Sequence, residues 1–562
     1  MRYGSDPVNF ATGNFLQTAD LFDVSGPGGT DTPVALTYNS MDPTSGRFGA
    51  GWSAGASAHT QTYTDGSVAV TDDQGAVTAF DPSGTSSFTP ALAGIHETLR
   101  RTAPDTLVLT QPDGSTQTFQ EDSYDGSGAL VGSTDRAGHA WSYSYGQVTV
   151  PIPGATGVTW PVALGEPPAP LVPTTRTAVG ALESITTPDG RVIGFGSDSA
   201  GRVTSVTRPD GAVWTIKYDS GGHLTSITDP DGHATRYGYG SSGNAAGLMT
   251  TVTAPDGVTY ITNTFDSAGR VVKQVNGDGD AATIAYGDGT TTYTDTTGAK
   301  TVFTIDATGR VSQVRTPQGN TLGTGYADWD TATSTDQNGG VTRYSYDANG
   351  NLVSTTDPMG ATTRYSYTSK GDLASQTDAL GNVTTYTVDS KGNTTAVAGP
   401  GGGNWAQAFD ASGNVTASTD PNGNTTSYRY DSHGNLTRVT DAAGGTTRMA
   451  YDGADRVSQV TDPDGGVTRY AYDGVGELTQ TTSPSGTVTK YAYQADGQVS
   501  SVTGPDGGVT AYTYNNGLNI ATVTDPSGGV TRYGYDSEYR RTSVTDPDGR
   551  VTRYAYDGEG LL

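Results

Sequence analysis

The segment Gly51-Trp52-Ser53-Ala54-Gly55 has the G-x-S-x-G spacing of a serine nucleophile. That chemistry requires a strand before the serine, a helix after it, and a histidine downstream in an α/β sheet. The surrounding sequence predicts neither the helix nor the α/β sheet. We therefore interpret the segment as the end of a strand with a buried Trp52, and not as a catalytic site.

Metal ligands are the second candidate chemistry. Residues 276–280 place oxygens at alternate positions, as a calcium loop does, but Ala281 and Gly287 stand where an EF-hand requires Gly and Glu. Repeated Asp-Pro-Asp-Gly turns leave weak calcium binding as an alternative, although Asp also serves turns without a metal. We expect no catalytic residue, no cofactor and no metal site. The histidines show no H-x-x-x-H pairing and are predicted to lie at the surface: His59, His96, His139, His223, His233 and His433.

Composition indicates which elements must position any site. The chain has 562 residues, no Cys, 31 Lys and Arg against 58 Asp and Glu, and a net charge of -27. Only 33% of the residues are hydrophobic, while Gly and Pro number 79 and 28. The 32 tyrosines exceed the 11 Phe and 6 Trp, which excludes a fully solvated disordered polymer. This profile predicts many short strands joined by tight turns.

The same numbers exclude two kinds of partner. A long polyanion repels phosphate, so we expect no nucleic acid partner. No run approaches the roughly 18 consecutive apolar residues of a membrane span, so we expect no membrane insertion by this segment.

Tyrosines recur with a period of 21 residues in two lanes that are two residues apart. Turn sequences such as Asp462-Pro463-Asp464-Gly465 keep the same phase, and Pro188-Asp189-Gly190 extends it upstream. The lanes contain Tyr344, Tyr346, Tyr365, Tyr367, Tyr428, Tyr430, Tyr470, Tyr472, Tyr491, Tyr493, Tyr512, Tyr514, Tyr533, Tyr535, Tyr554 and Tyr556.

The sequence of one 21-residue unit predicts the structure of all the repeats. Residues 467–472 are rich in β-branched and aromatic side chains, and a period of two places Thr468, Tyr470 and Tyr472 on one face of a strand. Residues 473–476 form a turn, 478–482 the return strand, and 483–486 the next turn. The predicted fold class is therefore all-β, a spiral of about 18 stacked 21-residue hairpins with little or no helix, because a ribbon of this length must coil.

The tyrosine lanes have two interpretations. Aromatic rings pack a sheet, and exposed rings stack on sugar faces. A packing role makes every unit alike, as the sequence does, whereas a binding site concentrates in a few units. Packing is favoured, and the periodicity leaves open whether the tyrosine face is directed inward or outward.

The unit Thr468-Arg469-Tyr470-Ala471-Tyr472-Asp473 and its copies resemble the tyrosine-aspartate (YD) repeats of the rearrangement hotspot (Rhs) proteins, a family that includes toxin-complex shell subunits and the teneurin shell. The resemblance covers roughly residues 182–562. The N-terminal segment is similar to the region that precedes the repeats in this family, through Asp6, Pro7, Gly13, Asn14, Gly49, Gly51 and Trp52.

The resemblance implies a hollow, non-enzymatic shell in a secreted or cell-surface polymorphic toxin, with the protein's own C-terminal toxic domain or another protein as cargo. We expect a negatively charged lumen that holds a basic cargo. No signal peptide is visible at the start, and the chain stops within a repeat, so we expect a fragment that forms a partial cocoon. The alternative is a cell-surface adhesion or carbohydrate-binding module, with carbohydrate or a cell-surface protein as partner.

Three regions are predicted. Residues 1–150 form a β-rich region that precedes the repeats, 151–175 a Pro-rich loop or linker, and 176–562 the hairpin array. Prolines at 151, 153, 167, 168 and 170 place the boundary, because proline lacks the N–H that a sheet interior needs.

Overall fold

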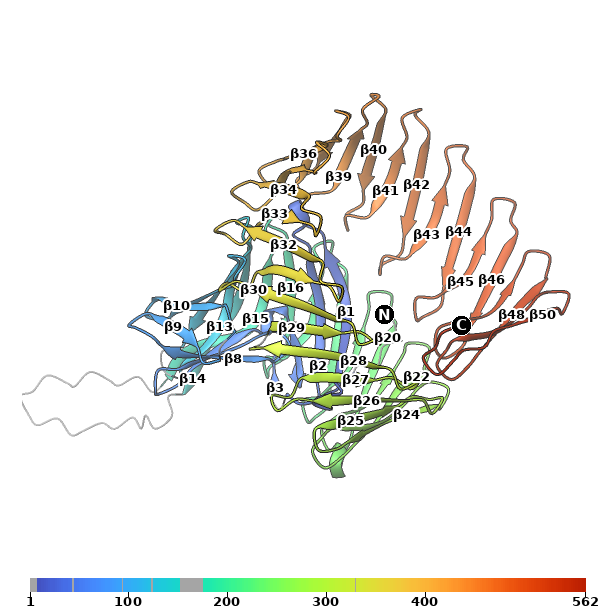
Figure 1. The fold of residues 1–562 in the computed structure, drawn as a ribbon. Coiled ribbons are helices and arrows are strands. Elements are labelled where there is room, and N and C mark those ends of the chain that lie inside the picture. Colours follow the sequence, from blue (N-terminus) through green and yellow to red (C-terminus); the bar gives the residue numbers. More distant parts are fainter. Residues whose placement is uncertain (1–7, 43–44, 93, 123–124, 152–174, 329) are drawn as a thin grey trace, which may run out of the picture.

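The computed structural model describes residues 8–42, 45–92, 94–122, 125–151, 175–328 and 330–562, and its long sheet curves through space (Figure 1). These residues contain strands and three short 3₁₀ turns, η1 (Pro27–Gly29), η2 (Gly55–Ser57) and η3 (Gly243–Ala245), and no α-helix. The predicted all-β class is confirmed. Within the described part of the chain, no helix has the length and apolarity needed to cross a membrane.

The strands that precede the long ladder lie in the first 134 residues. They are β1 (Leu16–Val24), β2 (Thr32–Asn39), β3 (Ser45–Gly46), β4 (Gly49–Ala50), β5 (Trp52–Ala54), β6 (His59–Thr62), β7 (Val68–Thr71), β8 (Val77–Pro82), β9 (Ser87–Pro90), β10 (Thr98–Ala103), β11 (Thr106–Thr110), β12 (Thr116–Glu121) and β13 (Ser127–Thr134).

From β14 onward each strand pairs antiparallel with the next. The first part of this ladder contains β14 (Ala140–Pro151), β15 (Thr175–Thr186), β16 (Val192–Ser197), β17 (Val203–Thr207), β18 (Val213–Tyr218), β19 (Leu224–Thr228), β20 (Ala234–Tyr239), β21 (Met249–Thr253), β22 (Thr259–Phe265), β23 (Val271–Val275), β24 (Ala281–Tyr286), β25 (Thr290–Thr294), β26 (Lys300–Ile305), β27 (Val311–Arg315), β28 (Thr321–Ala327) and β29 (Asp330–Thr335).

The second part contains β30 (Val341–Tyr346), β31 (Leu352–Thr356), β32 (Thr362–Tyr367), β33 (Leu373–Thr377), β34 (Val383–Val388), β35 (Thr394–Ala398), β36 (Asn404–Phe409), β37 (Val415–Thr419), β38 (Thr425–Tyr430), β39 (Leu436–Thr440), β40 (Thr446–Tyr451), β41 (Val457–Thr461), β42 (Val467–Tyr472), β43 (Leu478–Thr482), β44 (Val488–Tyr493), β45 (Val499–Thr503), β46 (Val509–Tyr514), β47 (Ile520–Thr524), β48 (Val530–Tyr535), β49 (Arg541–Thr545) and β50 (Val551–Arg553).

The repeating unit is the predicted hairpin, and β42 and β43 begin and end at the predicted residues. Within most hairpins of the ladder the register shifts once, as between Ala471 and Tyr472, so that Thr479 is an extra residue opposite them. The Thr479 hydroxyl donates to the Ala471 carbonyl at 3.1 Å. Such a bulge increases the local twist, and its repetition in most units bends the ladder.

The turns are held by their first side chain. In the turn at 347–351, one Asp347 carboxylate oxygen accepts the N–H groups of Asn349 at 2.9 Å and Asn351 at 3.0 Å. Gly350 has φ of +82°, which glycine adopts without steric cost. Asp, Asn and Gly therefore recur in the turns because the backbone there requires a local acceptor and a left-handed residue.

Strands β6 to β13 close a ring of eight, because β13 pairs with β6 as well as with β12. The far end of β13 pairs with β14, which starts the ladder. The ring encloses its own core, which consists of Ala58, Val68, Val70, Phe80, Leu99, Leu107, Leu109, Phe119 and Leu130.

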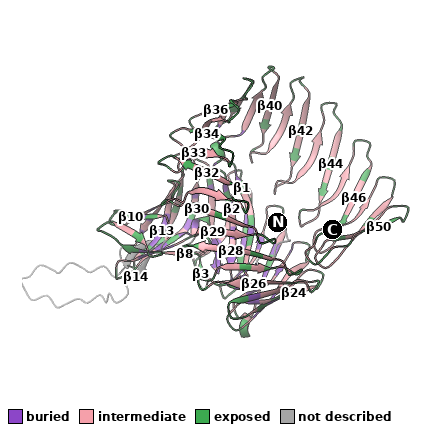
Figure 2. Cartoon of the chain, in the orientation of Figure 1, coloured by how far each residue is buried: buried purple, intermediate pink, exposed green. Residues whose placement is uncertain are grey.

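The N-terminal sheet of β1, β2 and β5 lies inside the curve of the ladder (Figure 1). Its apolar side chains share a second core with the first part of the ladder. Figure 2 shows buried residues where these strands meet, and mainly half-buried or exposed residues in β40 to β50. The predicted loop at 151–175 falls almost entirely outside the described residues, and the division into three regions stays a prediction.

Candidate functional site on the concave face and the seam

The two tyrosine lanes lie on the concave face of the ladder. In β18 the equivalent positions are Trp214, Ile216 and Tyr218, and the first two are buried in the core shared with the N-terminal sheet. The ladder is continuous, so the same face carries the lanes in later repeats. There the lane tyrosines are half-buried, while the residues that alternate with them, such as Arg343 and Ser345, are exposed on the convex face.

Tyrosines of the second lane make the same hydrogen bond in repeat after repeat. The hydroxyl donates to the main-chain carbonyl fifteen residues upstream, for example from Tyr367 to Leu352 at 2.7 Å and from Tyr451 to Leu436 at 2.8 Å. Burial raises the pKa of both hydroxyls, so they remain protonated donors. This hydrogen bond ties each hairpin that carries the tyrosine to the preceding hairpin, just beyond the point where their strand pairing ends. The other such donors are Tyr145, Tyr218, Tyr239, Tyr286, Tyr326, Tyr346, Tyr430, Tyr472, Tyr493, Tyr514, Tyr535 and Tyr556.

The N-terminal landmark residues attach the inner sheet to the wall. Gly13 has φ of +79°, and its carbonyl accepts the N–H of Val271 at 3.1 Å. The Asn14 side chain accepts the Ser40 hydroxyl at 3.1 Å. Gly49 has φ of +96°, and a Cβ there would lie 2.7 Å from the Gly222 carbonyl oxygen. The remaining predicted landmarks, Asp6 and Pro7, lie outside the described residues.

Aromatic side chains complete this attachment. The Trp52 indole N–H donates to the Tyr239 hydroxyl at 2.8 Å, and Tyr239 donates to the Leu224 carbonyl at 2.8 Å. Gly51 has φ of +72° and packs against the ring of Tyr38. Burial raises the pKa of Tyr38 to about 12. The N-terminal segment up to the end of β5 is therefore a plug that fills the first superhelical turn of the ladder.

A seam forms where the second superhelical turn lies on the first. Here the turns that follow the second-lane tyrosines (YD turns) in the late repeats meet the turns that follow the return strands (PDG turns) in the early repeats. Val475 N–H donates to Asp231 at 3.1 Å, Asn516 to Asp278 at 2.7 Å, and Thr296 N–H to Glu538 at 2.8 Å. The hydrogen-bonded residues of this ladder seam are 238 to 266 positions apart.

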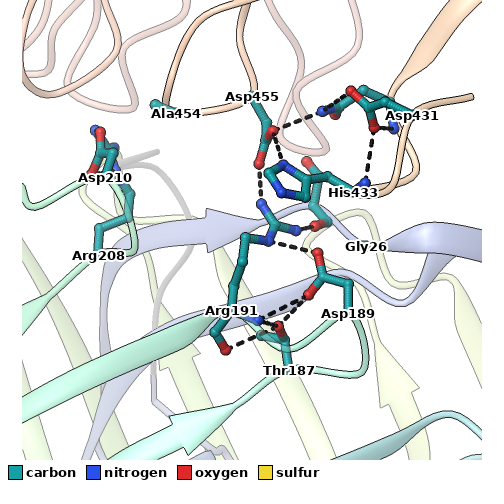
Figure 3. A network of polar contacts seen from close by, with 12 residues as sticks. Gly26, Thr187, Asp189, Arg191, Arg208, Asp210, Asp431, His433, Ala454 and Asp455 are labelled. Carbon is teal, nitrogen blue, oxygen red and sulfur yellow. Dashed lines mark hydrogen bonds and ion pairs between the residues drawn. The ribbon is translucent and has the colours of Figure 1, made fainter.

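An arginine clamp closes the seam beside the plug (Figure 3). Arg191 Nε donates to Asp189 at 2.6 Å, and its other nitrogens contact the Asp455 carboxylate and the Ser25 carbonyl. The side chains of Arg191, Asp455 and Asp189 are 13%, 11% and 2% exposed. Because these charges are withdrawn from water, the clamp depends on all partners being present.

Asp455 also has partners on its own side of the seam. It accepts the Asn435 amide at 2.7 Å and lies 3.0 Å from His433 Nδ1. A single carboxylate thus joins two late repeats to an early repeat and, through Arg191, to the plug.

An acidic pocket of about 250 Å³ lies further along the seam. Its lining includes Asp229 and His233 from the first superhelical turn and Glu477 and Asp496 from the second. Burial, and then the charge of Asp473, raise the pKa of Glu477 to about 7. This group therefore titrates near neutral pH.

The other chemical candidates have structural positions. Ser53 lies in β5 and donates its hydroxyl to the Thr37 carbonyl at 3.3 Å, and only the short turn η2 follows it. Asn276 accepts the N–H groups of Asp278 and Asp280, as in the other turns. Over the residues that the structure describes, no group of three or more acidic or histidine side chains is arranged to hold a metal ion.

The histidine expectation is wrong for His139. Its ring is 13% exposed and lies between Asp135, at 2.6 Å, and the Ser412 carbonyl, at 3.1 Å. His96 also reaches a later repeat, because a Cβ at Gly350 would lie 2.8 Å from its ring. A turn signal in the local sequence does not show whether a distant repeat of the superhelix will cover a histidine in that turn.

The negative charge of the late repeats lies in their turns and on neither face of the sheet. None of the strands β30 to β50 contains Asp or Glu, and the acids of this part lie in the turns. The expected negative lumen is therefore wrong for these strands, whose concave face presents mainly Tyr, Thr, Val and Leu. Acidic residues are needed in the turns as N–H acceptors, which explains their position.

These features define a class of protein: a repeat protein of antiparallel hairpins joined edge to edge and wound into a superhelix. The chain is an RHS-repeat protein, as its tyrosine lanes predict. The RHS Repeat model matches residues 177–213, 218–259, 330–362, 346–371, 409–447, 430–467, 451–488, 472–509, 516–551 and 540–562. A domain of unknown function (DUF6531) matches residues 5–80.

Several solved structures are similar to the chain. The Tc holotoxin pore of Photorhabdus luminescens has 13% identity over 92% of this chain and 29% of that chain, with a TM-score of 0.49. TcdB2-TccC3 without its hypervariable C-terminal region has 14% identity over 94% and 30%, with a TM-score of 0.40. The N-terminal domain of SpvB from Salmonella typhimurium has 13% identity over 42% and 98%, with a TM-score of 0.22. The chain thus spans less than a third of the first two structures, and no curated protein matches it significantly.

Proposed function

We propose that the chain is a non-enzymatic shell segment of a secreted or cell-surface toxin of the RHS type, and that the shell encloses the C-terminal toxic domain of a longer protein. The observation that carries the proposal is the closed seam. A wall whose successive turns are hydrogen-bonded to each other separates a concave face from solvent. The plug in the first superhelical turn supports the same function, because it blocks that part of the lumen.

The dimensions suit a polypeptide cargo. A separation of 238 to 266 residues corresponds to about 11 to 13 hairpins in each superhelical turn. At ~4.8 Å between strands this gives a perimeter of roughly 110–120 Å, and hence a wall about 35–40 Å across. The lumen of the second turn can therefore hold a chain segment or a small domain.

The lining favours contact without charge pairing. Half-buried tyrosine rings and threonine methyl groups offer apolar surface, and their hydroxyls offer hydrogen bonds. Such a surface accepts many sequences, which suits a shell that carries its cargo without recognising it. The alternative of sugar stacking on the tyrosines is less favoured, because these rings line the concave face.

Limited proteolysis of the longer native protein tests the proposal. We expect its C-terminal domain to resist digestion within the intact protein and to be digested when expressed alone. A seam variant, R191Q, serves as the opened control and should lose part of the protection. Complete digestion of the C-terminal domain under conditions that leave the repeats intact rejects enclosure.

A further inference from the structure

The convex face of the wall carries basic side chains in a row. Strands β30 to β50 contain ten Arg and Lys residues and no acidic residue. Seven of the ten occupy the same place in the repeat, directly before the first-lane position, which is a tyrosine in six of them and Met449 after Arg448. This basic row is exposed and consists of Arg343, Arg364, Arg448, Arg469, Lys490, Arg532 and Arg553.

The charges of the basic row are not neutralised by the fold. Arg469 lies between Gln459 and Thr482 on the neighbouring strands, and Lys490 lies between Gln480 and Thr503. Across the described ranges, the ion pairs of the repeats involve other residues, such as Arg456 with Asp452 at 2.8 Å. In a chain of net charge -27, a row of unpaired cations is therefore unexpected.

Three arginines lie side by side on this face. Arg429 of β38 is directly opposite Arg438 of β39, which is directly opposite Arg448 of β40. Like charges in such positions destabilise a sheet. The Nε atom of Arg438 is also buried without a hydrogen-bond partner. The arginine triad thus lowers stability in the free protein, and an anion bound across it would offset the repulsion between its charges.

We propose that the basic row and the arginine triad bind a linear acidic polysaccharide, one chain wide, that runs along the wall across the strands. Guanidinium groups bind carboxylate, sulfate or phosphate through two parallel hydrogen bonds. Equivalent residues of successive hairpins are roughly 10 Å apart, so charges repeated along a polymer can each meet one cation. This inference concerns the convex face and is independent of enclosure.

The shape of the surface selects this ligand class. The strands have five or six residues, about 20 Å, and aspartate turns border both ends, as Asp452 and Asp462 do for β41. A duplex or a membrane would bring its phosphates over these acids, whereas a thin chain stays on the basic strip. Single-stranded nucleic acids bind on aromatic platforms, and the tyrosine lanes lie on the opposite face.

Binding of polygalacturonate to the full chain at low salt is the test, measured by calorimetry at 50 mM and 300 mM NaCl. We expect binding at 50 mM that weakens at 300 mM, and no binding of uncharged dextran. The variant R448Q/R469Q/K490Q should bind roughly tenfold more weakly. The matched control K370Q/K391Q/R550Q removes three charges from the turns and should change affinity less than twofold. The secondary structure of both variants is checked by circular dichroism.

The variant R438Q separates binding from folding. It removes the like-charge contact, so we expect a higher unfolding midpoint together with weaker polygalacturonate binding. No binding at 50 mM, or an equal loss in the row variant and the turn control, overturns the proposal. Binding of single-stranded or duplex DNA that is as tight as that of polygalacturonate, and equally reduced by the row variant, assigns the surface to nucleic acid instead.

Discussion

The hydroxyl of Tyr472 donates a 2.9 Å hydrogen bond to the main-chain carbonyl of Val457 in the preceding hairpin. The pairing of β41 with β42 ends at Gln459 and Arg469, so this bond continues the contact beyond the last paired residues. It satisfies a carbonyl that the sheet leaves free and fixes the spacing between units. The second-lane tyrosine therefore holds neighbouring hairpins at a fixed spacing.

The variant Y472F should lower the free energy of unfolding by about 1 kcal/mol, because it removes the donor and leaves the Val457 carbonyl without its partner. The control is Y470F in the first lane, which should cost less than about 0.5 kcal/mol. Urea unfolding, followed by circular dichroism, compares the two variants. Equal effects would contradict the role assigned to the second lane.

Substitution of Arg191 in the clamp should lower the stability of the fold more than Y472F does. R191Q leaves Asp189 and Asp455 without their cation, and removal of one partner from a buried ion pair costs about 3 kcal/mol. Hydrogen exchange should speed up in residues 187–191 and 452–456. The control R550Q affects an arginine that is 76% exposed and should change stability by less than about 0.5 kcal/mol. Unchanged exchange at both turns in R191Q would show that the clamp does not hold the seam.

The local structure could be predicted from the sequence, and the seam could not. Residues 467–482 contain alternating side chains and turn formers, so the bounds of β42 and β43 follow from short-range signals. The pairing of Arg191 with Asp455 depends on the pitch of the superhelix, which accumulates from the twist of many hairpins. Asp455 also has φ of +59° where most repeats have glycine, and this departure from the repeat was the available signal.

Two turn glycines separate local backbone strain from a close approach to the plug. Gly465 has φ of +88° and open space around it, so G465A should cost about 1 kcal/mol from backbone strain alone. Gly434 has φ of +85°, but a Cβ there would lie 2.6 Å from the backbone nitrogen of Pro27 in the plug. G434A should therefore cost about 2 kcal/mol or more and should loosen the plug. Thermal unfolding and proteolysis near residue 27 measure both effects, and equal stability losses would show that the contact between Gly434 and the plug tolerates the added methyl group.

Glu477 makes the seam sensitive to pH near neutrality. Its pKa in the folded chain is about 7, above its ordinary value of 4.5, with burial as the first cause and Asp473 as the second. A raised pKa means that the group's contribution to stability is present at low pH and is lost as pH rises through about 7. At higher pH the carboxylate adds a further negative charge beside Asp473 and Asp231, with His233 opposing them.

The variant E477Q removes this titration and should be more stable than the wild type at pH 8 by about 1 kcal/mol, after allowance for solvent screening. At pH 5 the two proteins should differ little, because Glu477 is then protonated. D473N keeps an oxygen acceptor for the turn N–H groups of Gly476 and Glu477, and should move the midpoint of the wild-type pH profile downward. Unfolding midpoints at several pH values between 5 and 8 give these profiles. A stability difference between E477Q and the wild type that stays constant over this range would mean that Glu477 does not titrate there, and that the acidic pocket does not weaken the seam as pH rises.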